Sequence, residues 1–253
     1  MEILFLGHAG IIIKKDSILF AVDPFISGEF YWAGKKETYR GNSKWIGNIN
    51  SFLNRFGDSI NGIGITHAHG DHCDLSLLLK LLQINYRIKL LFPLPIIDWL
   101  KYSSIFNPLI THSLEPVRSN GDYILKHKND TMHIHTLPLP GVEKKEYPER
   151  VGYYISDDDT GLFIPGDVHD VGDWDSIKNS VSDLILWGID KREEIINYFN
   201  SSHYLKRIWW IHWENFIPGN ILCNVNPKKL ISDIGNSNNF NQFIPNFTDW
   251  YSL

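Results

Sequence analysis

The sequence predicts a mixed α/β (α+β) fold, built as a layered αββα sandwich. Many short apolar segments lie between turn residues, which is typical of strands. Segments with helical spacing of apolar residues are interspersed among them. The chain also shows two similar halves, and in each half predicted strands end at clusters of His and Asp. This pattern favours two sheets packed in layers with helices.

The first half begins with three predicted strands joined as a β-meander, at residues 2–6, 11–13 and 17–22. Residues 25–47, which hold many aromatic side chains, are expected to form a long irregular lid or binding loop. Strands are predicted at 62–66 and 88–92, and helices at 49–56, 75–83 and 95–101. Asp74 is expected to cap the second of these helices.

The second half repeats the pattern. The predicted strands are residues 122–126, 131–137, 152–156, 161–164, 184–187 and 208–211, with a helix at 192–199 between the last two. The tail at 224–253 is polar and rich in Asn, and no element or role is predicted for it.

The size and charge of the chain limit the number of domains and the class of partner that we expect. A chain of 253 residues with 43% hydrophobic residues can bury a sizeable core, and no linker interrupts it. We therefore expect a single domain that spans residues 1–253. The formal net charge is −5, which argues against broad electrostatic capture of nucleic acid, so a nucleic-acid partner is not expected.

Cysteine content and hydropathy predict the compartment. Cys73 and Cys223 are too few for a disulfide framework, which favours a reducing environment. No apolar run approaches the roughly 20 residues needed to span a bilayer. The first residues lack the basic and small-residue signature of a signal peptide. We expect a cytoplasmic protein without a transmembrane segment.

The strongest chemical signal is the sequence THAHGDH at residues 66–72, directly after a predicted buried strand. Imidazole and carboxylate are the ligands that zinc and similar divalent metals prefer. Alternate histidines can converge on one metal where the chain turns sharply, and Gly70 permits such a turn. We interpret the motif as a metal site rather than an exposed polar loop, with candidate ligands His67, His69, Asp71 and His72.

This H-x-H-x-D-H pattern resembles the signature of the metallo-β-lactamase superfamily, and the resemblance covers positions 1 to about 216. The segments at 7–10 (GHAG) and 23–25 (DPF) are similar to the opening of its lactonase-like and phospholipase-D-like branches. Gly166-Asp167, after an apolar strand, resembles the bridging aspartate of the family. His212, at the end of another predicted strand, resembles its last histidine ligand.

The resemblance implies two metal positions in a four-layer αββα metallo-β-lactamase sandwich. His67 and His69 would serve the first position. Asp71, His72 and His212 would serve the second, and Asp167 would bridge the two. A hydroxide held between the metals would be the nucleophile, because metal binding lowers the pKa of water. Asp71 would also orient it and handle its proton, which makes Asp71 the catalytic candidate. Zinc is the expected cofactor, with one or two ions per chain and manganese or iron as alternatives.

One ligand of the family pattern is missing. The family supplies a further histidine to the first metal from a loop near the middle of the chain, where this sequence reads LPLPG at 137–141. His133, His135 and His169 are candidates to replace it. The alternative is that each is an ordinary polar residue away from any metal.

His8 and Asp23 are expected beside the ligands rather than on the metal. Asp23 ends a predicted strand and could hold a ligand histidine in its correct tautomer. The alternatives are a turn residue for His8 and a turn or capping aspartate for Asp23. Nearby aromatic residues could line a pocket with an apolar wall, although core packing explains each of them as well. They are Phe25, Tyr31, Trp32, Trp213 and Phe216.

The sequence therefore predicts a metal-dependent hydrolase that acts on a lactone, another ester or amide, or a phosphodiester of a small molecule or lipid. The lactonase-like branch is the preferred comparison. One alternative is a nuclease of the same superfamily, against which the acidic balance of the chain counts. The other is a non-catalytic binding or sensor protein with an incomplete metal site. A homo-oligomer is expected only by analogy with the family.

Overall fold

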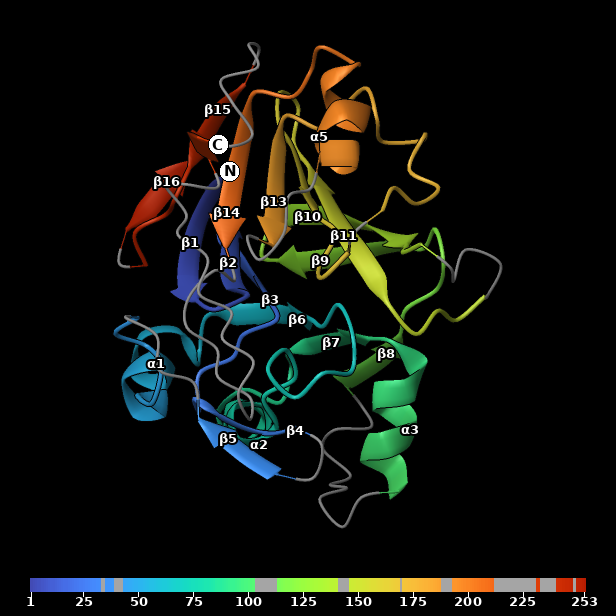
Figure 1. Cartoon of the computed structure of the whole chain (residues 1–253). Coiled ribbons are helices and arrows are strands. Elements are labelled where there is room, and N and C mark those ends of the chain that lie inside the picture. The colour runs from blue at the N-terminus through green and yellow to red at the C-terminus, as the bar shows by residue number, and fades with distance from the viewer. Residues whose placement is uncertain are drawn as a thin grey trace.

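The structure is a computed structural model that describes residues 1–32, 35–38, 43–102, 113–140, 146–168, 170–187, 193–211, 231–232, 240–247 and 249–253. Over these residues two seven-stranded mixed sheets pack face to face, and helices cover their outer faces (Figure 1). The predicted αββα sandwich is confirmed.

The first sheet combines a meander with parallel strands. Its strands, in spatial order, are β16 (Trp250–Ser252), β1 (Glu2–Gly7), β2 (Gly10–Lys15), β3 (Ile18–Val22), β6 (Ile60–Gly64), β7 (Lys89–Phe92) and β8 (Leu114–Pro116). β1, β2 and β3 pair antiparallel, as the predicted meander requires, and β3, β6, β7 and β8 pair parallel. The carboxyl ends of β3 and β6 therefore lie side by side at one edge.

The second sheet has the same mixed character. Its strands are, in order, β15 (Asn241–Phe243), β14 (Arg207–Ile211), β13 (Asp183–Trp187), β12 (Gly161–Ile164), β11 (Val151–Ser156), β10 (Asp130–Pro138) and β9 (Asp122–His127). β12 to β15 pair parallel, and β9 to β12 pair antiparallel. The carboxyl ends of its parallel strands are the second source of site residues.

Four described helices close the outer faces. They are α1 (Ile49–Phe56), α2 (Leu75–Ile84), α3 (Leu94–Tyr102) and α5 (Glu193–Asn200). α1, α2 and α3 share one apolar cluster with the first sheet, and α5 shares another with the second sheet. A third cluster, which includes Phe5, Phe20 and Tyr153, fills the space between the sheets. The Asp74 side chain accepts a hydrogen bond from the Leu77 amide, which confirms the predicted cap of α2.

Three segments differ from the sequence prediction: residues 25–47, the tail, and β8 at Leu114–Pro116, where no element was predicted. Residues 25–47 were expected to be irregular, but β4 (Glu29–Trp32) and β5 (Lys35–Thr38) pair as an antiparallel hairpin. Only two residues separate these strands in the sequence, and one is glycine, which is the spacing of a tight hairpin. The tail, for which no element was predicted, supplies an edge strand to each sheet. Its short polar strands carry too weak a pattern for prediction, since their pairing partners lie far away in sequence.

The two chain ends lie beside the neighbouring strands β1 and β16 of the first sheet. The Leu253 amide donates to the Met1 carbonyl over 3.0 Å, so the termini lie together (Figure 1). Among the described helices, none is both long and apolar enough to cross a bilayer.

A buried ion pair holds β13 and β14 in register. Asp183 is fully buried; Arg207 Nη2 donates to its Oδ2 over 2.9 Å, and Arg207 Nε lies 2.6 Å from its Oδ1. Trp209 Nε1 donates to the same carboxylate over 3.0 Å, and Arg207 Nη1 donates to the Ser252 carbonyl. The Asp183 carboxylate therefore links β13 to β14. Through Arg207 it also links both strands to β16, the edge strand of the first sheet.

We expect Asp183→Ala to lower the free energy of unfolding by about 3–5 kcal/mol, because it leaves the Arg207 charge and the Trp209 indole without their buried acceptor. Urea unfolding followed by fluorescence measures this change. Asp122→Ala is the matched control, since the Asp122 side chain is 85% exposed, and should change stability by at most about 0.5 kcal/mol. Equal effects of the two substitutions would contradict the anchoring role.

Candidate metal centre

The candidate site lies where strands from both sheets end. Asp23 follows β3, the histidine motif follows β6, and Asp167 follows β12. The Asp23 amide donates to the Gly64 carbonyl over 3.0 Å, which fixes the end of β3 against the start of the motif. Parallel topology therefore brings together side chains that are more than 40 residues apart in the sequence.

Gly166 lets the second sheet approach the first. It has a φ of +68°, and a Cβ at this position would lie 3.0 Å from the Thr66 side chain. The left-handed backbone and this close contact both favour glycine. The turn places Asp167, the next residue, over the histidine motif.

Nitrogen and oxygen donors of the motif and of Asp167 converge. His67 Nε2 lies 2.9 Å from His69 Nδ1 and 3.8 Å from Asp167 Oδ2. His72 Nε2 lies 3.2 Å from Asp167 Oδ2 and 3.8 Å from Asp71 Oδ2. Two ligands of a tetrahedral zinc ion lie roughly 3.4 Å apart, because each metal–ligand bond is about 2.0–2.2 Å long. These separations suit donors arranged around divalent cations.

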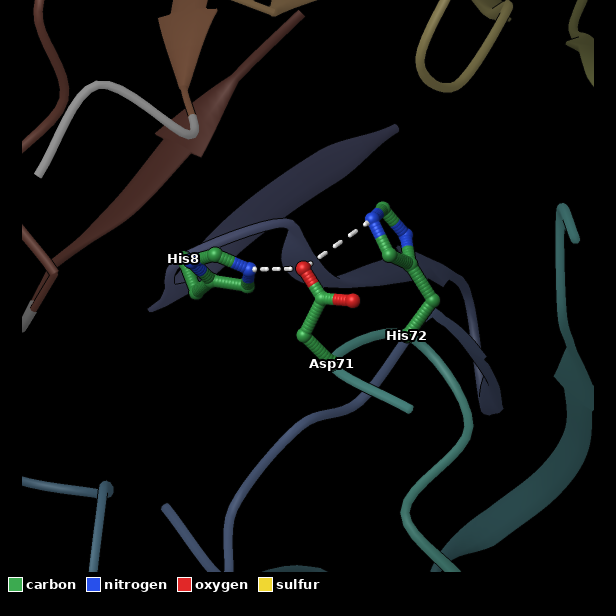
Figure 2. A group of neighbouring side chains, drawn as sticks. All are labelled: His8, Asp71 and His72. Atoms are coloured by element: carbon green, nitrogen blue, oxygen red, sulfur yellow. Dashed lines mark hydrogen bonds and ion pairs between the residues drawn. The ribbon is translucent and has the colours of Figure 1, made fainter. Parts of the chain in front are cut away.

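The donors form two groups that share His72. One group is His67, His72 and Asp167, and the other is His8, Asp71 and His72; in each group the donor atoms lie within 4.8 Å of one another. Figure 2 shows the second group, in which Asp71 lies between the two imidazole rings. A cavity of about 10 Å³, lined in part by Asp23, His72 and Asp167, adjoins the donors. It has room for about one water-sized occupant, which suits an ion.

The charges around His72 also suit a cation. Burial by itself would lower the pKa of His72, but the carboxylates of Asp167, Asp23 and Asp71 together raise this pKa well above its usual value. By contrast, burial and then the charge of His72 hold the pKa of His67 well below the usual value. The carboxylates therefore favour a positive charge at His72, and a divalent cation supplies such a charge.

Asp23 sets the tautomers of two histidines. Its Oδ2 accepts hydrogen bonds from His72 Nδ1 over 2.8 Å and from Thr66 Oγ1 over 2.6 Å, and its Oδ1 accepts from the Thr66 amide over 2.7 Å. Since the Thr66 hydroxyl donates to Asp23, it accepts from His67 Nδ1 over 2.9 Å. Both imidazoles then keep Nε2, on the side of Asp167, as the nitrogen that would bind a metal in place of a proton.

Thr66 was not assigned a role from the sequence. The only sequence signal for it is its position before the first histidine of the motif. Arg150 was also missed, because no motif contains it and only the pairing of the chain brings it close. It forms an isolated β-bridge with His67. Burial lowers the pKa of His69, and the positive charge of Arg150 adds to this lowering.

His8 lies in the tight turn between β1 and β2, and it is buried against the motif. Its Nε2 lies 2.8 Å from Asp71 Oδ2, and its ring packs 5.6 Å from the Phe25 ring. His8 has a φ of 52° and Asp23 a φ of 46°, in the left-handed region that few residues other than glycine adopt. Such strained residues gather at functional sites, where the surrounding contacts hold them.

The structure does not bring His135 to the other donors. Met132 and Ile134 face the core between the sheets, so the alternating side chains His133 and His135 point to the opposite face of β10. His135 Nδ1 lies 2.8 Å from Asp122 Oδ1 on β9. In this structure neither histidine therefore lies with the other donors, which favours the alternative of an ordinary polar residue for both. His169 and His212 lie outside the described residues.

The thiol of Cys73 does not favour a role as a metal ligand. Burial, followed by the charges of Asp23 and Asp74, raises the pKa of Cys73 to about 12. The thiolate that would bind a soft metal is therefore disfavoured.

Comparison with solved structures identifies the fold. Igni18, a metallo hydrolase from the archaeon Ignicoccus hospitalis KIN4/I, has a TM-score of 0.69 and 14% identity over 100% of this chain and 98% of that one. The metallo-β-lactamase fold protein YhfI from Bacillus subtilis has a TM-score of 0.58 and 12% identity over 99% and 98%. CmlA, a diiron β-hydroxylase from Streptomyces venezuelae, has a TM-score of 0.58 and 13% identity over 96% of this chain and 53% of CmlA.

No protein family and no curated protein matches the chain by sequence. The similar structures nevertheless establish the class: this chain has the metallo-β-lactamase fold, as the resemblance of its motifs implied.

We expect Asp23→Asn to weaken metal binding about 10- to 100-fold, because it removes the charge that orients His72 directly and His67 through Thr66. Competition with a chromogenic chelator measures the affinity. Asp122→Asn, which alters the carboxylate beside His135, is the control and should leave the affinity unchanged. Wild-type affinity in Asp23→Asn would remove Asp23 from the centre.

Proposed function

We propose that this protein is a metal-dependent hydrolase whose metal centre is formed by His67, His69, Asp71, His72 and Asp167. The observation that carries the proposal is the convergence of their donor atoms, with two imidazoles oriented by one buried carboxylate. Igni18, which is named a metallo hydrolase, has the same fold and supports the assignment. The proposed substrate is a small molecule that contains a lactone or another ester.

The ligands divide between two positions. His67 and His69 would serve the first, and Asp71 and His72 the second, with His212 as a further candidate. Asp167 would bridge them, since its Oδ2 lies 3.8 Å from His67 Nε2 and 3.2 Å from His72 Nε2. The imidazole and carboxylate donors suit zinc, and they also suit manganese or iron.

The side chains around the metal have separate tasks. When bound, the metal would lower the pKa of a water molecule and polarise the oxygen of the bond to be cleaved. Asp71 would orient the attacking water and take up its proton, and His8 holds the Asp71 carboxylate in place. The positive charge of Arg150, near His69, would help to stabilise negative charge that develops on the substrate.

The missing family histidine favours a second candidate, a non-catalytic metal-binding protein, because His133 and His135 do not replace it. Metal content separates the two possibilities. We expect one or two metals per chain by elemental mass spectrometry after purification without chelators, together with ester hydrolysis that a chelator abolishes. A protein without metal, even after reconstitution, would refute the hydrolase proposal.

We expect His69→Ala to lose most metal from the first position and nearly all hydrolytic activity, with its circular dichroism spectrum unchanged. His135→Ala is the matched control, since it removes a histidine with a carboxylate partner outside the centre. It should retain wild-type metal content and activity. Full activity in His69→Ala would refute the site.

We expect Asp167→Asn to lower the number of metals bound per chain, because the proposed bridge loses its charge. Elemental mass spectrometry after dialysis measures this number. Unchanged metal content would remove the bridging role of Asp167 but would leave the other ligands in place.

A further inference from the structure

A cavity of about 650 Å³ opens beside the metal centre. His69 and Gly70 of the motif form part of its wall, so it is continuous with the proposed reacting groups. The remaining wall comes from β4, from other residues of the loop between β6 and α2, from the start of α2 and from α3. Its volume lies in the range of pockets that bind small molecules, which is about 300–1,000 Å³.

The wall of this cavity is mainly apolar. Phe30, Ala68, Leu75 and Ile96 line it, together with Cys73. Phe30 is only 5% exposed, because it packs edge-on against Phe25 at 5.9 Å. Since Phe25 in turn packs against His8, the wall is built into the same cluster that supports the metal centre.

The carboxylates in the wall disfavour a negatively charged substrate group in this cavity. Asp74 is engaged in structure, since Oδ1 accepts from the Leu77 amide and Oδ2 from the Ile26 amide. Glu29 adds a second carboxylate to the lining. No Lys or Arg occurs among the lining residues that the structure describes. Away from His69, an anionic group would therefore meet carboxylates and apolar surface, and no described cationic side chain of the lining would offset its desolvation.

We propose that this cavity binds an uncharged hydrocarbon group of the substrate, so that the enzyme hydrolyses neutral esters or lactones that carry an apolar chain. This inference rests on the proposed function. The bond to be cleaved lies on the His69 side of the cavity. The water oxygen bonds to the carbonyl carbon and loses one proton to Asp71. The carbon–oxygen bond to the alcohol breaks, the alcohol oxygen takes up that proton, and the remaining water proton is released to solvent as the product acid ionises. The product carboxylate would form on the His69 side, where the charge of Arg150 acts.

The first test compares p-nitrophenyl acetate, butyrate and hexanoate with the metal-loaded protein. We expect kcat/KM to rise about three- to fourfold for each added methylene group, since burial of one methylene contributes about 0.8 kcal/mol. The p-nitrophenyl monoester of adipic acid has the same chain length as the hexanoate but ends in a carboxylate. Its kcat/KM should be at least tenfold lower than that of the hexanoate.

Two variants connect this preference to the cavity. Ile96→Trp should reduce kcat/KM for the hexanoate at least tenfold and leave the acetate within about twofold, because the indole occupies the space for the chain. Ile84→Trp, at a 45% exposed position of α2, is the control for an added indole outside the cavity and should match the wild type. Because Ile96 is only 2% exposed, an unchanged circular dichroism spectrum of Ile96→Trp is required before its rates are compared. Glu29→Lys, an exposed change that does not depend on repacking, should raise the relative rate of the adipate monoester at least fivefold.

The outcomes separate the two proposals. Equal kcat/KM for all chain lengths, or a preference for the adipate monoester, would overturn the cavity assignment while metal-dependent acetate hydrolysis upheld the hydrolase. If no ester is hydrolysed, calorimetric binding of 2-nonanone, which is neutral and not hydrolysable, decides the cavity by itself. Binding that Ile96→Trp weakens at least tenfold supports it, and equal or undetectable binding in both proteins overturns it.

Discussion

The candidate centre depends on one buried carboxylate. Asp23 accepts hydrogen bonds from the Thr66 amide, the Thr66 hydroxyl and His72 Nδ1, and it is only 2% exposed. Through these bonds it fixes the end of β3 against the end of β6 and sets the tautomers of two histidines. A buried carboxylate requires such partners because its desolvation is costly. The contacts that stabilise the buried Asp23 carboxylate therefore also orient the metal ligands.

The packing of the two sheets determines where Asp167 lies relative to the histidine motif. Asp167 comes from the other sheet and reaches the motif through a glycine with positive φ packed against Thr66. At the opposite ends of β13 and β14, Asp183 and Arg207 hold these strands in register. Relative movement of the sheets would separate Asp167 from His72, so the intersheet core preserves the donor geometry as well as the fold.

The same loop that carries the histidines also borders the apolar cavity. His69 and Gly70 face it, and Asp74 caps the helix that forms one of its walls. The proposed metal ligands and the wall of the substrate cavity are therefore separated by only a few residues of one loop. CmlA, about half of which matches this chain, is a diiron β-hydroxylase, so the fold alone does not determine the reaction. The reaction depends on the metal-ligand donors and on the residues that line the cavity.

The sequence by itself determined the four described helices, the strands of the two large sheets other than β8, β15 and β16, and the motif at residues 66–72, because hydrophobic periodicity and ligand spacing are local properties. It also indicated Asp23, His8 and Asp167 through a family pattern. Only the tertiary structure decided that Thr66 links Asp23 to His67, that His135 points away from the centre, and that the Asn-rich tail completes both sheets. These outcomes depend on strand pairing and on which face of a sheet a side chain occupies, and both are set by contacts between residues far apart in the chain.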